Sequence, residues 1–449
     1  MTNKIKGGYK GRILRINLST SEIENFPLDV DLAEKYIGGI GLNTYYLYHE
    51  LNPHTEPLSP DNVLILGIGP LVGTGAPGSD RVELTGKSPL TNGFGSANAG
   101  VFLGIEFKQV GFDHIILKGK APKPVYVWIH EQCVEIIEAT HLWGKTTWET
   151  VSIIRHELRD EKVHVISIGP AGEKLVRFAN VQNGFYSGFS RGGLGAIMGS
   201  KNLKAIAVRG TSKKVPIANV EKFTRATQEA FSRIKKDPFY SATVKYGSMA
   251  FAAGELVPND KISAEYFYEN LKEKTLGCYN CPMPCAHWVK IKKGPYKGTQ
   301  LRGGEVAPLF AFSRACQIMD QEMVIKYSEL CLKYGLDMIS TAVTIGWAMD
   351  CYERGLIDKK DTGGFEIKKG DGEIVLDLIN MIVSREGFGD ILAEGSFRAS
   401  ELIGKETKEY LMGVKGMEIY SDPRLGLPGW AWCFSQAVSA RGDPAKPHP

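Results

Sequence analysis

The stretch SRGGLGAIMGSKNLKAIAV, residues 190–208, places an arginine and several glycines ahead of an apolar run. The run LKAIAVRG (203–210) has the pattern of a strand bounded by glycine. In a glycine-rich turn of this kind, several backbone N–H groups can converge on an anion, and the guanidinium of Arg191 would lie beside them. The stretch predicts an anion-binding turn that leads into a strand of a β-rich domain.

A second glycine-rich stretch, GSDRVELTGKSPLTNGFGSANAG at 78–100, carries Arg81, Asn98 and Gly100. It combines a guanidinium, an amide and small residues that allow the backbone to approach a ligand closely. For both stretches an alternative stays open at this point, because tight turns in a β domain have the same glycine content. They are candidate anion sites.

The first 210 residues are predicted to be mainly strands and turns. Apolar and polar residues alternate in runs separated by glycine and proline, as expected for half-buried strands. Two segments, 64–73 and 165–173, each end a β run in an Ile-Gly-Pro turn, which predicts two related sheets in one domain. The strand runs are 12–18, 113–119, 124–130, 133–139, 162–169 and 203–210.

Helical spacing dominates after about Val215. Apolar residues recur at three- and four-residue steps, with polar N-caps such as Asn219 and Asp320 and glycine stops such as Gly335 and Gly387. The fold class is therefore α+β, with a β-rich domain at 1–210, a helical domain at 211–410 and the start of a second helical domain at 411–449. The predicted helices are 219–238, 321–334, 341–354 and 373–385, and 255–305 is predicted to be irregular.

Charge and cysteine usage exclude several classes of protein. The 449 residues carry a net charge of +4, which gives no electrostatic case for a nucleic-acid or membrane partner. The basic N-terminus has no apolar core after it, and no apolar run is long enough to span a bilayer. The eight cysteines show no even framework of spacings, which favours a reducing, cytoplasmic location over disulfide bonds.

Three cysteines lie within the eight residues CYNCPMPC: Cys278, Cys281 and Cys285. Cys-x2-Cys-x3-Cys spacing lets one short loop present its thiolates to a metal centre, and iron–sulfur clusters are held by thiolates. Zinc and unmetallated thiols remain the alternatives. Among the other cysteines, Cys331 and Cys351 are expected to be small buried residues, and Cys433, in the apolar run WAWCF, is expected to be buried rather than to act as a ligand.

No catalytic constellation of side chains appears in the sequence. The nine histidines do not cluster, and neither a Ser-His-Asp arrangement nor an HExxH motif is present. The chemistry is therefore predicted to come from a bound cofactor.

Taken together, these segments resemble the tungstopterin aldehyde:ferredoxin oxidoreductase family. The likeness follows the family's order of motifs across nearly the whole chain. The matching pieces are GRILRINLSTSEIE near the start, YIGGIGLN (36–43), GPLVGTGAPGSDR (69–81), KSPLT (87–91), LWGK (142–145), SIGPAGE (167–173), the 190–208 stretch, CYNCPMPC, YGLD (334–337), REGFGDILAEGS (385–396) and YSDPRLGLPG (420–429).

The resemblance implies a β-rich N-terminal domain followed by mostly helical domains, with the cofactor between them. The family's cofactor is tungsten, or sometimes molybdenum, held by two pterins (a bis-molybdopterin) whose phosphates are bridged by Mg²⁺, with a [4Fe–4S] cluster beside one pterin. Cys278, Cys281 and Cys285 match three cluster ligands. The positions that match pterin and phosphate contacts are Arg81, Asn98, Ala99, Gly100, Gly188, Arg191, Gly192, Gly193, Gly335, Leu336 and Asp337.

Several positions depart from the family pattern. The leading aspartate of the D-x-x-G-L-D pterin motif is Leu332 here, and the iron-binding E-x-x-H of some members is replaced by KYSE at 326–329. An acidic residue near the metal falls at Ala307, which leaves Glu305 as a weak catalytic candidate. The family's fourth cluster cysteine and second pterin motif lie beyond residue 449, so the chain is expected to be a fragment.

The expected activity is oxidation of an aldehyde to a carboxylic acid under anaerobic conditions, with electron transfer through the cluster to ferredoxin or to an iron–sulfur subunit. Two alternatives stay open: an active-site subunit of a ring-reducing benzoyl-CoA reductase, which Ala307 favours slightly, and a homologue without catalytic activity. A homo- or hetero-oligomer is expected, without nucleic acid and without a membrane span.

Overall fold

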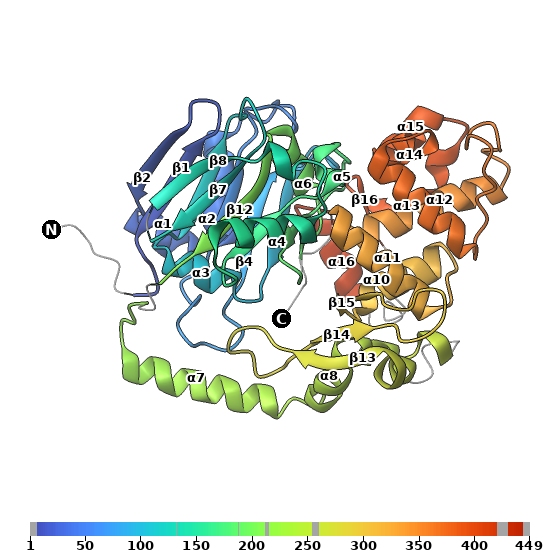
Figure 1. The fold of residues 1–449 in the computed structure, drawn as a ribbon. Helices are drawn as coiled ribbons and strands as arrows, with labels where there is room; N and C mark the ends of the chain where they lie inside the picture. The colour runs from blue at the N-terminus through green and yellow to red at the C-terminus, as the bar shows by residue number, and fades with distance from the viewer. Residues whose placement is uncertain are drawn as a thin grey trace.

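The computed structural model describes residues 7–131, 133–186, 188–211, 215–253, 260–419 and 430–442. Figure 1 shows two layers of strands from the N-terminal part beside a group of helices from the C-terminal part. The long helix α7 (Val220–Lys235) runs along the lower edge of the molecule in this view, below the N-terminal strands and towards α8. Within the described ranges, no helix is both long and apolar enough to cross a membrane.

The first sheet has six strands in the order β2-β1-β6-β3-β4-β5. The pair β1–β6 is parallel, and the other neighbouring pairs are antiparallel. Its central strands are buried on both faces, and therefore they contain long apolar runs such as LILGI in β3. The strands are β1 (Arg12–Asn17), β2 (Glu22–Pro27), β3 (Leu64–Ile68), β4 (Val82–Lys87), β5 (Phe94–Ala99) and β6 (His114–Lys118).

The second sheet also has six strands, in the order β11-β10-β9-β12-β7-β8. The two Ile-Gly-Pro segments lie one in each sheet, after β3 and after β9, so the prediction of two sheets is confirmed. All six predicted strand runs are confirmed to within two residues at each end. The strands are β7 (Val125–His130), β8 (Cys133–Glu138), β9 (His164–Ser167), β10 (Val181–Asn183), β11 (Gly188–Phe189) and β12 (Leu203–Arg209).

The two sheets share one core, and helices α3 (Leu103–Gln109) and α6 (Leu194–Ser200) are part of it. Strand alternation explains the layering: Ile115 and Leu117 of β6 face this inner core, and Ile116 faces an outer core with α1 and α2. Helix α4 covers the outer face of the second sheet. The outer helices are α1 (Val30–Tyr36), α2 (Ile40–Glu50) and α4 (Thr147–Leu158), and the short α5 (Pro170–Glu173) follows β9.

Helix α6 corrects the prediction that the 190–208 turn leads directly into a strand. LGAIMGS forms a buried helix between the turn and β12, although glycine is a poor helix former. The glycines are required by packing, because a Cβ on Gly195 would overlap the carbonyl oxygen of Asn180 and one on Gly199 would overlap that of Gly172. Close backbone approach outweighs helix propensity here.

The C-terminal part is mostly helical, as predicted, but 255–305 is not wholly irregular. It contains a three-stranded antiparallel sheet, β13 (Lys272–Leu276), β14 (Ala286–Lys290) and β15 (Gln300–Gly303). The other elements are α8 (Tyr240–Tyr246), α9 (Ala264–Tyr266), α10 (Val306–Ala315), α11 (Gln321–Tyr334), α12 (Met338–Glu353), α13 (Gly372–Ser384), α14 (Phe388–Leu392), α15 (Ser396–Ile403), β16 (Gly413–Val414), β17 (Met417–Glu418), α16 (Trp430–Val438) and short 3-10 or π turns at Thr140–Leu142, Gly247–Ala252, Asp260–Ile262, Phe267–Leu271 and Thr407–Tyr410.

Three helix boundaries differ from the prediction, and one of them is the end of α7, which stops at Lys235, three residues before the predicted end. Helix α12 begins three residues early because Asp337 caps it, accepting a hydrogen bond from the backbone N–H of Ile339. Helix α13 ends at Arg385, which adopts the left-handed conformation at φ 55°, and Gly387 instead precedes α14. The prediction places Gly387 at the end of α13, whereas the structure places it just before α14. Glycine readily adopts the left-handed conformation, which occurs both where one helix ends and in the turn before the next.

The scattered cysteines divide into two groups. Cys331 and Cys351 are buried, as predicted. The predicted burial of Cys433 is wrong, because its side chain is exposed on α16. Trp430 and Phe434 of the same helix are 78% and 69% exposed, so these two side chains are not part of a core among the described residues.

Candidate functional site

Arg81 and Asn98 lie side by side at the edge of the first sheet. Arg81 directly precedes β4 and Asn98 belongs to the edge strand β5, which pairs with β4 so that Glu83 faces Asn98. The Arg81 Nη1 donates a hydrogen bond to Asn98 Oδ1 at 3.0 Å. Arg81 is exposed and Asn98 is half-buried, so a cationic, hydrogen-bonding surface is held on a rigid strand pair.

The backbone turns sharply where β5 ends. Ala99 and Gly100 are buried, and then Val101 and Phe102 both adopt left-handed conformations, at φ 65° and 66°. Such conformations cost about 1–3 kcal/mol each for residues other than glycine and persist only where the surroundings enforce them. Here the carboxylate of buried Asp80 enforces them, since its Oδ2 accepts hydrogen bonds from both N–H groups at 2.8 and 3.2 Å.

The cysteine loop docks on this same turn. The N–H of Tyr279 donates to Asp80 Oδ2 at 3.3 Å, and the rings of Tyr279 and Phe102 are 6.3 Å apart in an edge arrangement. The carbonyl oxygen of Asn280 accepts from the N–H of Gly78 at 3.2 Å. The structure therefore joins two motifs that are about two hundred residues apart in the sequence.

The three thiols of the loop are close enough to influence one another's charge. Burial raises the pKa of Cys278 and of Cys281, and the neighbouring Asp80 and Cys285 add to the effect on both thiols. The described side chains contain no group of three His, Cys, Asp or Glu residues arranged around one metal ion. Each thiolate of a cubane site binds a different iron, and three cysteines at this spacing can supply three such ligands.

The second glycine-rich segment lies against the first. Gly188 is in β11, and Gly192 and Gly193 follow in left-handed conformations at φ 84° and 73°. Ser88, after β4, donates a hydrogen bond from Oγ to the carbonyl oxygen of Gly192 at 2.8 Å. Side chains would not fit at Gly193, where a Cβ would overlap the carbonyl oxygen of Arg177.

Arg191 is buried and makes protein contacts. Its Nη2 donates to the carbonyl oxygen of Glu418, and its Nε is 3.2 Å from Asp337 Oδ2. Burial raises the pKa of Asp337, and the charge of Arg191 opposes that rise. This ion pair links the glycine-rich turn to the first residue before α12.

The Gly335-Leu336-Asp337 segment is held by the N-terminal part of the chain. Gly335 ends α11 in a left-handed conformation, and its carbonyl oxygen accepts from the N–H of Asn180 at 2.8 Å. Asn180 also donates from Nδ2 to the carbonyl oxygen of Leu336 at 2.9 Å. The N–H of Asp337 donates to the carbonyl oxygen of Phe178 at 3.1 Å. The structure thus brings this segment beside Arg191, with its backbone groups engaged by protein.

Three buried acids near these motifs were missed in the sequence. Asp80 joins the turn to the cysteine loop, and Glu418 accepts hydrogen bonds from Ser340 and Ser396. Glu83 is hydrogen-bonded by Ser96, and burial raises its pKa to about 7. Asp80 and Glu83 lie within two residues of Arg81, but their roles depend on contacts with distant residues that the local sequence does not reveal.

Glu305 lies on the surface at the start of α10. It precedes α10 without capping it, its side chain is 51% exposed, and Arg302 Nη1 lies 3.6 Å away. Ala307 follows in the first turn of α10. Glu305 therefore stays a weak candidate.

An arginine–glycine anion site on paired sheets, with a thiolate loop docked on it, is the arrangement expected of a redox enzyme that holds an anionic cofactor near an iron–sulfur cluster. Comparison with known proteins agrees with that class. The family model described as aldehyde ferredoxin oxidoreductase, N-terminal domain, matches residues 13–210. The model described as aldehyde ferredoxin oxidoreductase, domains 2 and 3, matches residues 227–444.

Similar proteins cover most of the chain. The tungsten-containing aldehyde ferredoxin oxidoreductase of Pyrococcus furiosus is 40% identical over 435 residues, which are 93% of this chain and 71% of that protein. The aliphatic sulfonate oxidoreductase, WOR-like subunit, of the same organism is 32% identical and is covered to 74%. Among solved structures, a chain of the active site complex BamBC of benzoyl coenzyme A reductase gives a TM-score of 0.82 at 30% identity, with 92% of this chain and 66% of that chain covered.

The chain belongs to the aldehyde ferredoxin oxidoreductase family, and it is an oxidoreductase. The resemblance drawn from its motifs and the α+β fold class are confirmed.

Proposed function

We propose that the protein oxidises aldehydes to carboxylic acids at a tungsten, or molybdenum, bis-pterin centre. Electrons would leave through a [4Fe–4S] cluster to ferredoxin or to an iron–sulfur subunit. The observation that carries the proposal is the docking of the cysteine loop on the Arg81–Asn98 turn through Asp80. The 40% identity to a tungsten-containing aldehyde ferredoxin oxidoreductase supports the choice of reaction.

The residues present fit the pterin part of the cofactor. Pterin phosphates are anions, and the exposed guanidinium of Arg81 lies where the backbone bends tightly at Gly100. Arg191, which is paired with Asp337, adds a second guanidinium next to Gly192, where the absence of a side chain leaves room. Mg²⁺ would bind between the phosphates. These groups would hold and orient the cofactor, with Asp80 fixing the turn that carries them.

For five other residues, the case for a part in cofactor binding is more indirect: Gly188, Ala99, Gly335, Leu336 and Asp337. They surround the two arginines, but the carboxylate of Asp337 faces Arg191 and the carbonyl oxygens of Gly335 and Leu336 accept hydrogen bonds from Asn180. Their proposed share is to position Arg191 and the turn at Gly192.

The cysteine loop fits a cluster that is close to the pterin. Cys278, Cys281 and Cys285 would supply three thiolates, and the hydrogen bond from Tyr279 to Asp80 keeps the loop against the turn that starts at Gly100. When bound, the metal–pterin group supplies the two-electron redox step, which consumes water and releases two protons as the aldehyde becomes an acid. The protein contributes orientation, exclusion of water and a short path for electrons.

Ring reduction is the second candidate, and two observations favour it. The solved BamBC chain has a TM-score of 0.82 to this one, and Ala307 stands where aldehyde-oxidising members carry an acidic residue.

The location in the cytoplasm and an oligomeric assembly stay predictions.

The test is a paired assay on anaerobically purified protein grown with tungstate. Short aldehydes and an aromatic coenzyme A thioester are offered separately, with a viologen dye as the electron carrier. Dye reduction that depends on the aldehyde supports the proposal. Turnover of the thioester alone would replace it with ring reduction, and no turnover of either by a metal-loaded protein would favour a homologue without catalytic activity.

A further inference from the structure

A polar pocket of about 350 Å³ opens between the first sheet and helix α15, away from the Arg81–Asn98 turn. Its walls are the loop 53–57, Lys87 and Asn92 from the turn after β4, and Arg398 from α15. This volume lies at the small end of the range for ligand pockets. None of the groups assigned to the proposed reaction lines it.

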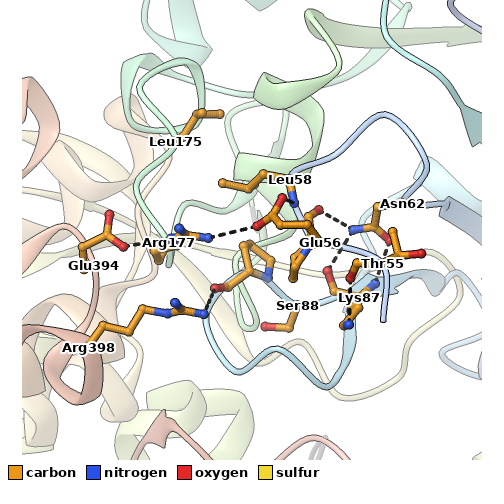
Figure 2. A network of polar contacts seen from close by, with 12 residues as sticks. Thr55, Glu56, Leu58, Asn62, Lys87, Ser88, Leu175, Arg177, Glu394 and Arg398 are labelled. Carbon is orange, nitrogen blue, oxygen red and sulfur yellow. Dashed lines mark hydrogen bonds and ion pairs between the residues drawn. The ribbon is translucent and has the colours of Figure 1, made fainter. Parts of the chain in front are cut away.

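The side chain of Lys87 is held in this pocket by two hydrogen bonds, and its ammonium group has one more donor. It is 9% exposed, and its Nζ donates to the carbonyl oxygens of Pro53 and Thr55 at 2.6 and 2.7 Å. An ammonium group has three donors, so one remains for a ligand. Buried Asn62 fixes the walls by donating from Nδ2 to the carbonyl oxygens of Pro57 and Lys87 at 2.6 and 3.0 Å (Figure 2).

Arg398 approaches from the helical part and is lightly engaged. Its guanidinium donates one long hydrogen bond, from Nη2 to the carbonyl oxygen of Pro89 at 3.4 Å. Figure 2 shows it reaching towards the loop that follows Lys87. Within the described part of the chain, neither Lys87 nor Arg398 has a carboxylate at ion-pair distance, so neither cation is engaged in an ion pair.

The one acid that lines the pocket, Glu56, is engaged elsewhere. Its Oε2 accepts a hydrogen bond from the N–H of Leu58 at 2.7 Å, and its Oε1 lies 3.8 Å from Arg177. Arg177 is in turn hydrogen-bonded to Glu394 at 2.9 Å, and Figure 2 shows it between the two glutamates. Arg177 is shared between two glutamates and is closer to Glu394, so Glu56 offsets part of the positive charge of Lys87 and Arg398 and leaves the pocket with a net positive charge of about one.

We infer that this pocket binds a phosphate dianion, either free or as the monoester group of a small molecule. A phosphate monoester carries close to two negative charges at pH 7 and has several acceptor oxygens, so it can contact both cations at once, whereas a carboxylate carries one charge and two oxygens. Lys87 would act as a point charge, and Arg398 would present its planar donors to the phosphate oxygens. The inference goes beyond the proposed function and does not depend on it.

The wall of the pocket is continuous with the candidate active site. Ser88, next to Lys87, is the residue whose Oγ bonds the carbonyl oxygen of Gly192. Ser88 also accepts from the N–H of Thr91 at 3.1 Å, so the turn that carries Lys87 and Asn92 is braced against the second glycine-rich segment. The site is thus built on rigid elements.

The experiment measures binding of inorganic phosphate, glycerol phosphate and acetate to the full chain by calorimetry, before any metal is loaded. The parent should bind phosphate or its monoester, and Arg398→Gln should weaken that binding about tenfold or more because a charged hydrogen bond is lost. Arg398→Lys should retain most of the affinity. Arg225→Gln, which removes an exposed arginine on α7, should change nothing.

Two further results sharpen the test. Stronger binding of glycerol phosphate than of inorganic phosphate would identify a small-molecule ester as the ligand, and the reverse would identify the free ion. No binding to the parent at about 1 mM phosphate, acetate binding as strong as phosphate binding, or an Arg398→Gln variant that binds like the parent would each overturn the inference. Circular dichroism confirms that each variant is folded.

Discussion

Arg191 Nε and Asp337 Oδ2 lie 3.2 Å apart, with side chains that are 7% and 1% exposed. This buried ion pair connects the second glycine-rich turn to the start of α12, so it joins the β-rich and helical parts at the candidate cofactor site. Asp337 also caps α12 through Oδ1, at 3.1 Å from the N–H of Ile339. Asp337 therefore both caps α12 and holds the side chain of Arg191 in place.

Asp337→Asn separates these two roles. Asparagine is a good N-cap, so the helix end is retained while Arg191 loses its counter-charge in a buried setting. Breaking one side of a buried ion pair costs about 3–5 kcal/mol. We expect a loss smaller than that in the free energy of unfolding, measured with urea, because burial raises the pKa of Asp337 and so already disfavours its charged form. Asp377→Asn, at an exposed site on α13, is the control, and equal stability of the two variants would contradict the assignment.

Asp80→Ala should release the cysteine loop from the first glycine-rich turn. It leaves the N–H groups of Val101, Phe102 and Tyr279 without their acceptor, and each unsatisfied buried group costs about 1–3 kcal/mol. Hydrogen exchange followed by mass spectrometry should show faster exchange at 100–102 and 278–281, with little change in the sheets. Uniform exchange across the whole chain would mean that Asp80 acts on global stability instead.

Glu83 should make stability depend on pH. Its pKa is about 7 in the folded chain against an ordinary value of 4.5, with burial as the main cause. Because the folded pKa is raised, its stabilising contribution is fully present below about pH 4.5 and is lost as the pH rises through about 7.

Glu83→Gln removes this dependence. Relative to the parent, the variant should gain about 2–4 kcal/mol in unfolding free energy between pH 5 and pH 8. Urea titrations at the two pH values measure the difference, and Glu161→Gln, at an exposed position, serves as the control. A difference between variant and parent that stays constant with pH would show that Glu83 is ionised throughout.

Cys281→Ala tests the cluster. We expect loss of bound iron and of the electron paramagnetic resonance signal of the reduced cluster, together with loss of turnover, because a cubane depends on its thiolate ligands. Cys133→Ala removes an exposed thiol outside the loop and should leave all three readouts unchanged. Full turnover in Cys281→Ala would remove this loop from the electron path.

Local patterns predicted six strand runs and four helices correctly, but they missed helices α1 to α6 and strands such as β4, and some of these misses have clear physical causes. Alternation identified β1 and β6, whereas β4 was missed because VELTGK buries Glu83 and Lys87 with hydrogen-bond partners that no local pattern reveals. Helix α6 was missed because its glycines are poor helix formers and serve backbone packing.

In the candidate site too, residues in local motifs could be predicted from the sequence, and residues that act through long-range contacts could not. Arg81, Asn98 and the three cysteines stand in recognisable motifs, and the structure brings them together. Asp80 was not recognised, because its bond to the N–H of Tyr279 joins positions 199 residues apart. Contacts of that range come from the fold, which single-sequence periodicity does not encode. The ligand roles of these residues stay predictions.

The most direct test of the proposed function is metal analysis of the intact chain, purified without oxygen from cells supplied with tungstate. The account predicts about one tungsten or molybdenum and about four iron atoms per chain, with the iron lost in Cys281→Ala. Zinc alone, or no metal at all in a chain that remains folded, would contradict it.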